Sequence, residues 1–354
     1  MKKLFILFIT MFLCVSATAS CTTPPNNTSS TATLANTATA STSALIQIVT
    51  PTTPPGGPFT WAIAASPDGN LWFTEMDTNN IGEFSPATGK ITEYNVPTAI
   101  AYPHGIVLGP DGNIWFTEPT SDKIGRISPT TGSITDYSIP TANAGPFGIA
   151  AGPDGNLWFT EINGIGKISP VTGTITEYNI PTADAGAYGI TDGPDGNLWF
   201  TESYVNQIGK ISPVTGAITE YPIPIANTEP NGITAGPDGN LWFTEINGTG
   251  IGKISPMTGA VTEYSVSIGN AGPDSITAGS DGNLWFTQFQ ENQIGKISPT
   301  TGEITEYNVP TADAGPFSII MGPDDNLWFT ELNQNKIGKI SLTSGIITEY
   351  LLNN

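Results

Sequence analysis

The sequence predicts an all-β protein, a seven-bladed β-propeller with four antiparallel strands in each blade. The tetrapeptide Trp-Phe-Thr-Glu recurs seven times, with glutamine in place of its last residue once. The steps between successive tryptophans are 43, 43, 41, 43, 43 and 43 residues. Each unit also contains four short strand-like runs, and repeats of about 40–45 residues with four strands are typical of propeller blades. The repeated tryptophans are Trp72, Trp115, Trp158, Trp199, Trp242, Trp285 and Trp328.

The second unit shows the four strands in their chain order. An apolar run bounded by Gly105 and Gly109 predicts the innermost strand, because backbones crowd together near the axis. Asp111-Gly112 then stands between two apolar runs and predicts a hairpin turn. The second, third and outer strands are expected over residues 114–118, 124–128 and 134–140.

The repeated aromatic and aspartate positions are expected to serve the scaffold. Seven Trp-Phe pairs at one strand position predict packing between neighbouring blades. The aspartates of the turns lack the alternating acids of a calcium-binding loop, so we interpret them as turn residues.

The N-terminal residues predict export. Residues 1–20 combine Lys2 and Lys3, an apolar stretch and small residues, as in a secretory signal peptide. Residues 21–43 are rich in Ser, Thr and Pro and predict a disordered spacer, and residues 44–354 form the expected propeller. Two alternatives remain at the processing site, namely a lipidated Cys21 or ordinary cleavage after Ala19. We therefore expect a cell-surface or periplasmic lipoprotein, or a secreted protein.

The ends of the propeller segment predict how the ring closes. Residues 45–49 read as an additional outer strand ahead of the first unit. Pairing of the two terminal strands avoids a frayed edge. We expect residues 45–49 to pair with the last blade, beside or outside residues 346–351.

Charge and cysteine content exclude several functions. Without Lys2 and Lys3, the chain has 31 acids against 9 bases, a net charge of about −22. Such a chain is repelled by nucleic acids and by anionic membranes, so a lipid anchor is the one membrane contact expected. Cys14 and Cys21 belong to the signal region, so the mature chain forms no internal disulfide. We expect a monomer.

The residue type just before each innermost strand varies from unit to unit, and only phenylalanine occurs there twice. In a closed ring these seven side chains should surround the mouth of the central channel. Four aromatics, a histidine, an amide and an acid form a mostly apolar cup with a few polar groups, as a small-molecule site requires. The seven residues, which we term the central ring, are Trp61, His104, Phe147, Tyr188, Asn231, Asp274 and Phe317.

A ring of acids is expected at the same end. If Asp111-Gly112 is a two-residue turn, Leu108 lies opposite Trp115 and Gly105 opposite Glu118, which places Glu118 beside His104. Crowded carboxylates have raised pKa values and attract divalent cations. The equivalent positions are Glu75, Glu161, Glu202, Glu245, Gln288 and Glu331. The alternative is that each acid is a strand end that bonds to neighbouring loops.

His104 is the one histidine of the protein. A histidine oriented by a carboxylate such as Glu118 is suited to general-base catalysis near neutral pH. The alternative is an ordinary polar residue of the surface or core.

The repeated motifs resemble those of the streptogramin B lyases, the virginiamycin B lyase family. They are Gly-Pro-Asp-Gly-Asn-Leu-Trp-Phe-Thr-Glu, Ile-Gly-Lys-Ile and Ile-Thr-Glu-Tyr, and the resemblance spans residues 45–351. It implies a seven-bladed propeller that opens a cyclic depsipeptide by magnesium-assisted elimination at its ester, an activity tied to antibiotic resistance. Pro103-His104-Gly105-Ile106 matches the family stretch that carries the general base.

The sequence departs from that family pattern at several positions. Tyr102 stands where a glutamate is usual, and Trp61 and Phe147 occupy the places of a second histidine. His104 lies in the second unit, whereas the family places its catalytic histidines late in the chain. A signal peptide is a further departure, because members that inactivate antibiotics act in the cytoplasm.

Three hypotheses follow for function. In the first, a lyase, His104 removes a proton alpha to a carbonyl, and Mg²⁺ held by Glu118 and Glu75 polarises that carbonyl. The second is a non-catalytic exported propeller that binds a ligand, glycan or protein at the channel mouth. A third is metal-dependent lactone hydrolysis with Asn231, Asp274 and a rim glutamate as ligands. A serine hydrolase is disfavoured, since no Gly-x-Ser-x-Gly elbow occurs.

Overall fold

The structure is a computed structural model that describes residues 59–247, 250–266 and 272–352. Across these residues the chain forms seven four-stranded antiparallel sheets and no helix. Each sheet is one blade made of four consecutive strands, which confirms the predicted fold class and the number of blades.

The strands of each blade follow one another without a crossover. The first four blades consist of β1 (Thr60–Ala65), β2 (Leu71–Glu75), β3 (Asn80–Ser85) and β4 (Lys90–Asn95); β5 (Ile106–Leu108), β6 (Ile114–Glu118), β7 (Lys123–Ile127) and β8 (Ile134–Ser138); β9 (Ile149–Ala151), β10 (Leu157–Glu161), β11 (Gly164–Ile168) and β12 (Ile175–Asn179); and β13 (Ala187–Asp192), β14 (Leu198–Glu202), β15 (Gln207–Ile211) and β16 (Ile218–Pro222). The last three blades consist of β17 (Pro230–Ala235), β18 (Leu241–Glu245), β19 (Gly250–Ile254) and β20 (Val261–Ser265); β21 (Pro273–Ala278), β22 (Leu284–Gln288), β23 (Gln293–Ile297) and β24 (Ile304–Asn308); and β25 (Pro316–Met321), β26 (Leu327–Glu331), β27 (Lys336–Ile340) and β28 (Ile347–Leu351).

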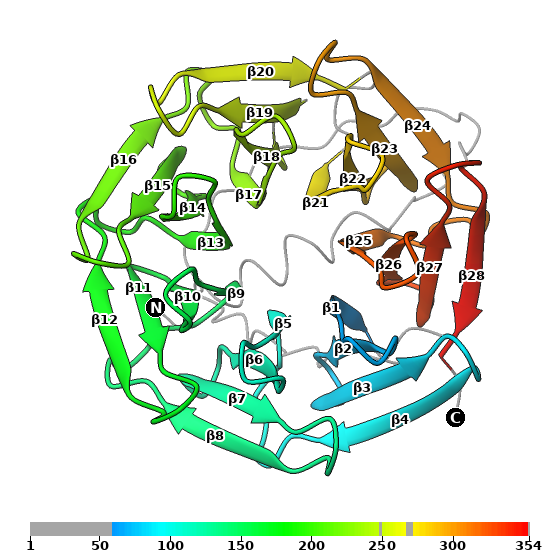
Figure 1. Ribbon diagram of the computed structural model, residues 1–354, viewed down its shortest axis with the longest axis horizontal. Coiled ribbons are helices and arrows are strands. Elements are labelled where there is room, and N and C mark those ends of the chain that lie inside the picture. The colour runs from blue at the N-terminus through cyan, green and yellow to red at the C-terminus, as the bar shows by residue number, and fades with distance from the viewer. Residues whose placement is uncertain (1–58, 248–249, 267–271, 353–354) are drawn as a thin grey trace, which may run out of the picture. The chain divides into compact units, whose positions relative to one another are not determined.

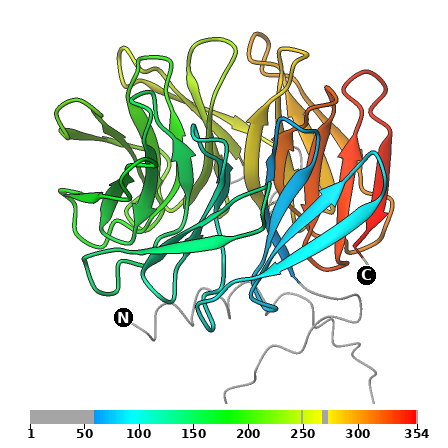
Figure 2. The same cartoon turned by 60° about the horizontal axis from the view of Figure 1, so that its bottom comes forward.

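The blades stand in a ring around one axis (Figure 1). The first strand of each blade is innermost and the fourth lies at the periphery, as β1 and β4 of the first blade illustrate. Figure 2 shows the same ring tilted, with the connecting loops at both ends of the blades. The innermost strands therefore define the centre, where the candidate site lies.

The predicted hairpin register is wrong by one residue. Val107, and not Leu108, lies opposite Trp115. The reason is the length of the turn: the Gly109 N–H donates to the Asn113 carbonyl at 2.8 Å, so three residues lie between them where two were expected. Asp and Asn side chains form hydrogen bonds to nearby backbone, and this stabilises such a turn.

A β-bulge shifts the start of the innermost strands. In the first blade Thr60 pairs with Glu75, but Ile63 already pairs with Phe73, so β1 contains one extra residue. In the second blade the Thr117 N–H donates to the Gly105 carbonyl at 3.0 Å. The expectation that Gly105 faces Glu118 is therefore wrong.

Each tryptophan packs against the next blade. Trp115 of the second blade lies in one buried cluster with Leu157 and Phe159 of the third. Trp328 of the seventh blade lies in a cluster with Phe73 of the first, so the same contact closes the ring. The seven tryptophans are fully buried. The predicted packing between blades is confirmed.

In six blades the turn aspartate accepts the indole N–H of the tryptophan, and in the first blade Trp72 donates to Ser66 instead. In the third blade the Trp158 indole N–H donates to Asp154 Oδ1 at 3.0 Å. Burial alone would raise the pKa of Asp154, but hydrogen bonds from Trp158 and Asn156 outweigh it and lower that pKa. Tyr178 stacks on Trp158 at 5.6 Å, and Lys167 Nζ lies 5.1 Å from the indole centre. These contacts agree with the interpretation of the aspartates as turn residues.

The N-terminal expectations lie outside the described residues. This applies to the signal peptide at residues 1–20, the spacer at 21–43, Cys21, and the pairing of residues 45–49 with the last blade. Within the part of the chain that the structure describes, no helix has the length and apolar character needed to cross a membrane.

Candidate functional site

The central ring is held by a repeated hydrogen bond between blades. Thr201 Oγ1 accepts the N–H of Gly189 at 2.9 Å within its own blade and donates to the carbonyl of Asn231 in the next blade at 2.8 Å. All seven blades repeat both bonds, and each threonine is fully buried. These residues, which we term the threonine belt, are Thr74, Thr117, Thr160, Thr201, Thr244, Thr287 and Thr330.

The threonine belt was missed by sequence reasoning. Its signal was present, because a threonine recurs at one strand position in all seven units. Thr330 donates to the carbonyl of Trp61 at 3.0 Å, so the belt continues across the junction of the last and first blades. The belt fixes the backbone at each residue of the central ring, and the side chains there are held in place relative to one another.

Five side chains of the central ring form a continuous aromatic arc. Trp61 lies 4.4 Å from Phe317 and 5.0 Å from His104, measured between ring centres. His104 lies 5.2 Å from Phe147 in an edge contact, and Phe147 stacks on Tyr188 at 5.3 Å. These are the separations at which aromatic pairs attract each other. We term Phe317, Trp61, His104, Phe147 and Tyr188 the aromatic arc.

The remaining two members form a polar pair. Asn231 Nδ2 lies 3.4 Å from both the carbonyl and Oδ1 of Asp274. Both residues are buried, and burial raises the pKa of Asp274 well above its usual range. Burial is the largest cause that raises the pKa of Tyr188, and Asp274 adds to it. The structure thus brings five of the seven predicted residues together in the aromatic arc and the other two together in the polar pair.

His104 is a buried, neutral imidazole. It is 8% exposed, and its Nε2 lies 3.2 Å from the Tyr188 hydroxyl. Burial lowers the pKa of His104 to about 3, although a hydrogen bond with the backbone of Phe147 acts in the opposite direction and raises that pKa. The imidazole of His104 is therefore uncharged at neutral pH, and its contacts with Tyr188 and Phe147 orient it.

The expected pair of His104 and Glu118 is not formed. Glu118 accepts a hydrogen bond from Ser121 Oγ at 3.0 Å. Burial, and then the charge of Asp136 on the outer strand, raises the pKa of Glu118 to about 7. The backbone of the second blade explains the difference. His104 and Gly105 both bond to Thr117, and this extra residue separates His104 from Glu118.

The rim acids do not fit a magnesium site. Glu75 accepts from Thr78 Oγ1 at 2.9 Å, and burial raises its pKa to about 7. Among the described residues no three His, Cys, Asp or Glu side chains come together as metal ligands. Magnesium prefers several oxygen ligands in octahedral geometry, which this donor set does not supply.

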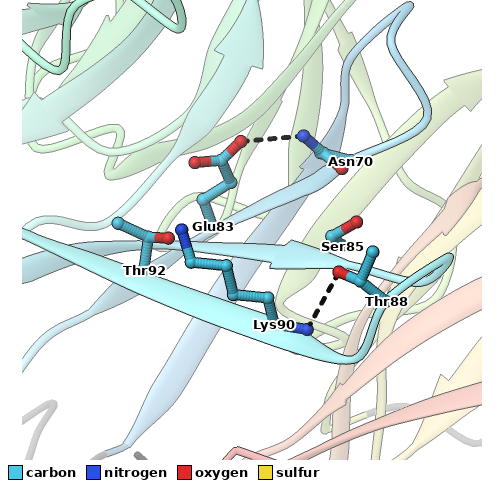
Figure 3. Close-up of a pocket in the computed structure, with 6 residues that line it drawn as sticks. All are labelled: Asn70, Glu83, Ser85, Thr88, Lys90 and Thr92. Carbon is cyan, nitrogen blue, oxygen red and sulfur yellow. Dashed lines mark hydrogen bonds between the residues drawn. The ribbon is translucent and has the colours of Figure 1, made fainter.

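A shallow hollow lies apart from the central ring, on the first blade. It has a volume of about 220 Å³ and is lined by Asn70, Glu83, Ser85, Thr88, Lys90 and Thr92. Figure 3 shows Asn70 donating to Glu83, at 2.8 Å. Glu83 also accepts a hydrogen bond from the Tyr94 hydroxyl at 2.9 Å. Glu83 occupies the position that Lys167 has in the third blade. Asn70, Glu83 and Tyr94 are thus already hydrogen-bonded to one another.

Comparison with known proteins identifies close relatives. The model of the virginiamycin B lyase family matches residues 36–233 and 163–354. A solved streptogramin B lyase is 42% identical, with a TM-score of 0.75 over 80% of this chain and 93% of that chain. Virginiamycin B lyase from Staphylococcus aureus is 40% identical, with a TM-score of 0.75 over 80% and 94% of the two chains. No curated protein matches significantly.

Two further structures extend the comparison. A catalytically inactive histidine-to-alanine variant of the Staphylococcus aureus lyase was solved with quinupristin, also 40% identical with a TM-score of 0.75 over 80% and 94% of the two chains. The extracellular domain of a one-component system from B. thetaiotaomicron is 18% identical, with a TM-score of 0.66 over 81% of this chain and 41% of that chain. The second similarity concerns the fold alone.

Proposed function

Because the chain belongs to the virginiamycin B lyase family, we propose that its central ring binds a small ligand that carries an aromatic or apolar ring. The observation that carries the proposal is the aromatic arc. Trp61, Phe147 and Tyr188 keep part of their surface exposed, although they pack against one another. Partly exposed aromatic faces fixed by their neighbours offer apolar contact at little cost in side-chain entropy.

The polar pair supports an oriented mode of binding. Small-molecule sites are mostly apolar, and a few polar groups fix the orientation of the ligand. Asn231 and Asp274 supply such groups, and the nearby His104 and Tyr188 supply a nitrogen and a hydroxyl. A ring-containing ligand with one or two hydrogen-bonding groups matches this arrangement.

Titration with quinupristin tests the binding proposal. We expect saturable heat release in calorimetry with the wild-type protein, and at least tenfold weaker binding for Tyr188→Ala, because the stacked face is lost. The matched control is Tyr204→Ala, which removes an exposed aromatic outside the central ring. No heat of binding for the wild type, or equal loss for the control, would contradict binding of this ligand at the central ring.

Elimination is the second candidate function. It is favoured by the identity of 40–42% to solved lyases and by the neutral state of His104, since a general base must be unprotonated. In this reaction His104 takes the proton alpha to the carbonyl. The electrons of that C–H bond form a double bond, and the C–O bond of the ester breaks to release a carboxylate. A pKa of about 3 makes His104 a weak base, so binding is better supported than elimination.

Mass spectrometry of the incubated antibiotic separates the reactions. Elimination yields an opened product of unchanged mass, whereas lactone hydrolysis adds one water. An opened isomer formed by the wild type and not by His104→Ala supports the lyase, with or without added Mg²⁺. Unchanged quinupristin in the presence of measurable binding leaves the non-catalytic propeller as the function.

We also propose that the protein is exported, on the strength of residues 1–20, which have the pattern of a secretory signal peptide. A lipid at Cys21 would tether it to a membrane. Labelling cells with a radioactive fatty acid tests this, and Cys21→Ser should lose the label while the exported fraction remains. Retention of the full-length chain in the cytoplasm would contradict export.

A further inference from the structure

In six of the seven blades a buried glutamate faces an acid of the outer strand across a glycine. In the fourth blade Phe200 pairs with Gly209, and Gly209 pairs with Glu220. A Cβ added to Gly209 would lie 2.6 Å from Glu202 Oε1, so the carboxyl of Glu202 extends over this glycine. The absent side chain lets Glu202 and Glu220 approach each other. We term such a couple a carboxyl pair, and the same register gives Glu161/Glu177, Glu245/Glu263 and Glu331/Glu349.

The inner members of these pairs lack the partners that an ionised carboxylate requires. Glu202 is fully buried, and neither of its side-chain oxygens has a donor. Both oxygens of Glu331 and Oε1 of Glu161 and Glu245 share this state. An isolated buried carboxylate is costly, and in practice such a group becomes neutral.

The outer members, in contrast, have donors. Glu220 accepts the N–H of Thr182 at 3.0 Å. Glu349 accepts the N–H and the hydroxyl of Thr311, at 3.1 and 2.9 Å. Each pair therefore consists of an outer carboxyl that is hydrogen-bonded and an inner carboxyl with at least one oxygen that has no donor. The charge of the pair belongs on the outer acid.

The sixth blade supplies a natural comparison. Gln288 occupies the position of the buried glutamate, and its Nε2 donates to Glu306 Oε1 at 3.2 Å. An amide N–H stands here where a protonated glutamate would present its O–H. A metal ion would need an oxygen at this point, and the amide directs its nitrogen to Glu306 instead.

We propose that Glu161, Glu202, Glu245 and Glu331 are proton-binding sites. Each buried carboxyl keeps a bound proton and donates a hydrogen bond through it to the acid of the outer strand. The proton forms one O–H bond and one O–H···O⁻ hydrogen bond, and no other reactant is required. Hydrogen bonds to an ionised acceptor are shorter and stronger than neutral ones. The sites stabilise the blades as long as the protons remain bound.

The charged groups around these sites support the assignment. Burial, followed by the charge of Glu220, raises the pKa of Glu202 to about 8. Glu177 and Asp122 act on Glu161, Glu263 acts on Glu245, and Glu349 acts on Glu331, where Lys336 opposes it. Burial is the largest cause in every case.

The sign of the pH effect follows from these pKa values. The pKa of Glu202 is about 8 in the folded protein against the ordinary 4.5, so between these values the folded state binds more protons than the unfolded state. The stabilising contribution is present below the lower value and is lost as the pH rises through the higher one. Alkaline conditions should therefore loosen the propeller.

Three substitutions test the proposal in the full chain. Glu202→Gln introduces the arrangement seen at Gln288, so it should raise the melting temperature at about pH 8.5 and leave it unchanged at about pH 4.5. Gln288→Glu creates a new pair and should show the opposite, a loss confined to the higher pH. Glu303→Gln is the control, because Glu303 is exposed on an outer turn, and it should show no dependence on pH.

Infrared spectroscopy reads the proton directly. At about pH 6.5 the wild type should show the C=O band of un-ionised carboxyl groups, and both Glu202→Gln and Glu331→Gln should weaken it. An unchanged band, or a loss of stability at both pH values for Glu202→Gln, would overturn the proposal. So would a chelator that lowers the melting temperature of the wild type at about pH 8.5, because a cation would then occupy the pairs.

Discussion

The histidine of the central ring illustrates how the environment of one residue sets its chemistry. His104 stands among Trp61, Phe147 and Tyr188, and burial among them suppresses its positive charge. A solvent-exposed histidine at neutral pH would be a stronger base. The low pKa of His104 therefore follows from its buried position, where neither water nor a carboxylate stabilises the positive charge.

Replacement of His104 by phenylalanine should change the response to acid. The pKa of His104 is about 3 when folded and 6.5 ordinarily, so the unfolded state binds the proton first as the pH falls, and stability is lost below about pH 6.5. At about pH 4 this costs the wild type about 3 kcal/mol, which His104→Phe avoids. Urea unfolding of both proteins at about pH 8 and pH 4 measures it. An equal difference between the proteins at the two pH values would contradict the buried neutral state.

At the scale of elements, the repeat shows which features a sequence specifies. The spacing of the tryptophans predicted every blade, because each blade buries one tryptophan against the next. The hairpin register was missed, since the Asp-Gly signal fits turns of two and of three residues equally well. The bulge ahead of Ile106 was missed as well, because the extra residue is a member of the central ring and reads as part of the strand. The bulge is what separates Glu118 from His104, because the turn of three residues alone would place these two residues opposite each other.

The hairpin turn of the seventh blade is an element that can be improved. Asp325 has a φ of 57° where the other blades have glycine, as Gly196 with a φ of 74°. A side chain in the left-handed region costs energy that glycine avoids, although glycine loses more entropy on folding. Asp325→Gly should raise the free energy of unfolding by about 0.5 kcal/mol, and Gly196→Asp should lower it by a similar amount. Urea unfolding of the two variants measures both, and changes of the same sign would contradict the argument.

For the whole molecule, the ring is closed by the same contacts that join any two blades. Trp328 packs on Phe73, and Thr330 donates to the carbonyl of Trp61 at 3.0 Å, where the other six belt threonines donate to the next blade at 2.6 to 2.8 Å. The described strands of the first and seventh blades therefore meet without exchanging a strand. The central ring depends on this junction, because Trp61 and Phe317 lie on its two sides.

Loss of the belt bond at the junction should weaken the entire propeller. Thr330→Val keeps the shape of the side chain but leaves the Ser318 N–H and the Trp61 carbonyl without their partner. We expect the free energy of unfolding to fall by about 2–4 kcal/mol, since buried groups without a hydrogen bond are costly. The control Thr348→Val lies on an exposed outer-strand position and should change stability by less than about 0.5 kcal/mol. Equal effects of the two would contradict a role for the belt in closure.

Because the threonine belt repeats the same contact between every two neighbouring blades, the ring does not depend on which blade comes first in the chain. Seven equivalent joints mean that any of them could serve as the break between the first and last residues, and a circularly permuted chain that starts at another blade should build the same ring. A histidine that comes early in one such chain and late in another can therefore lie at the same position around the axis. The place of His104 in the second blade therefore carries no information about its role, and equivalence between propellers of this kind is judged by neighbours across the central ring.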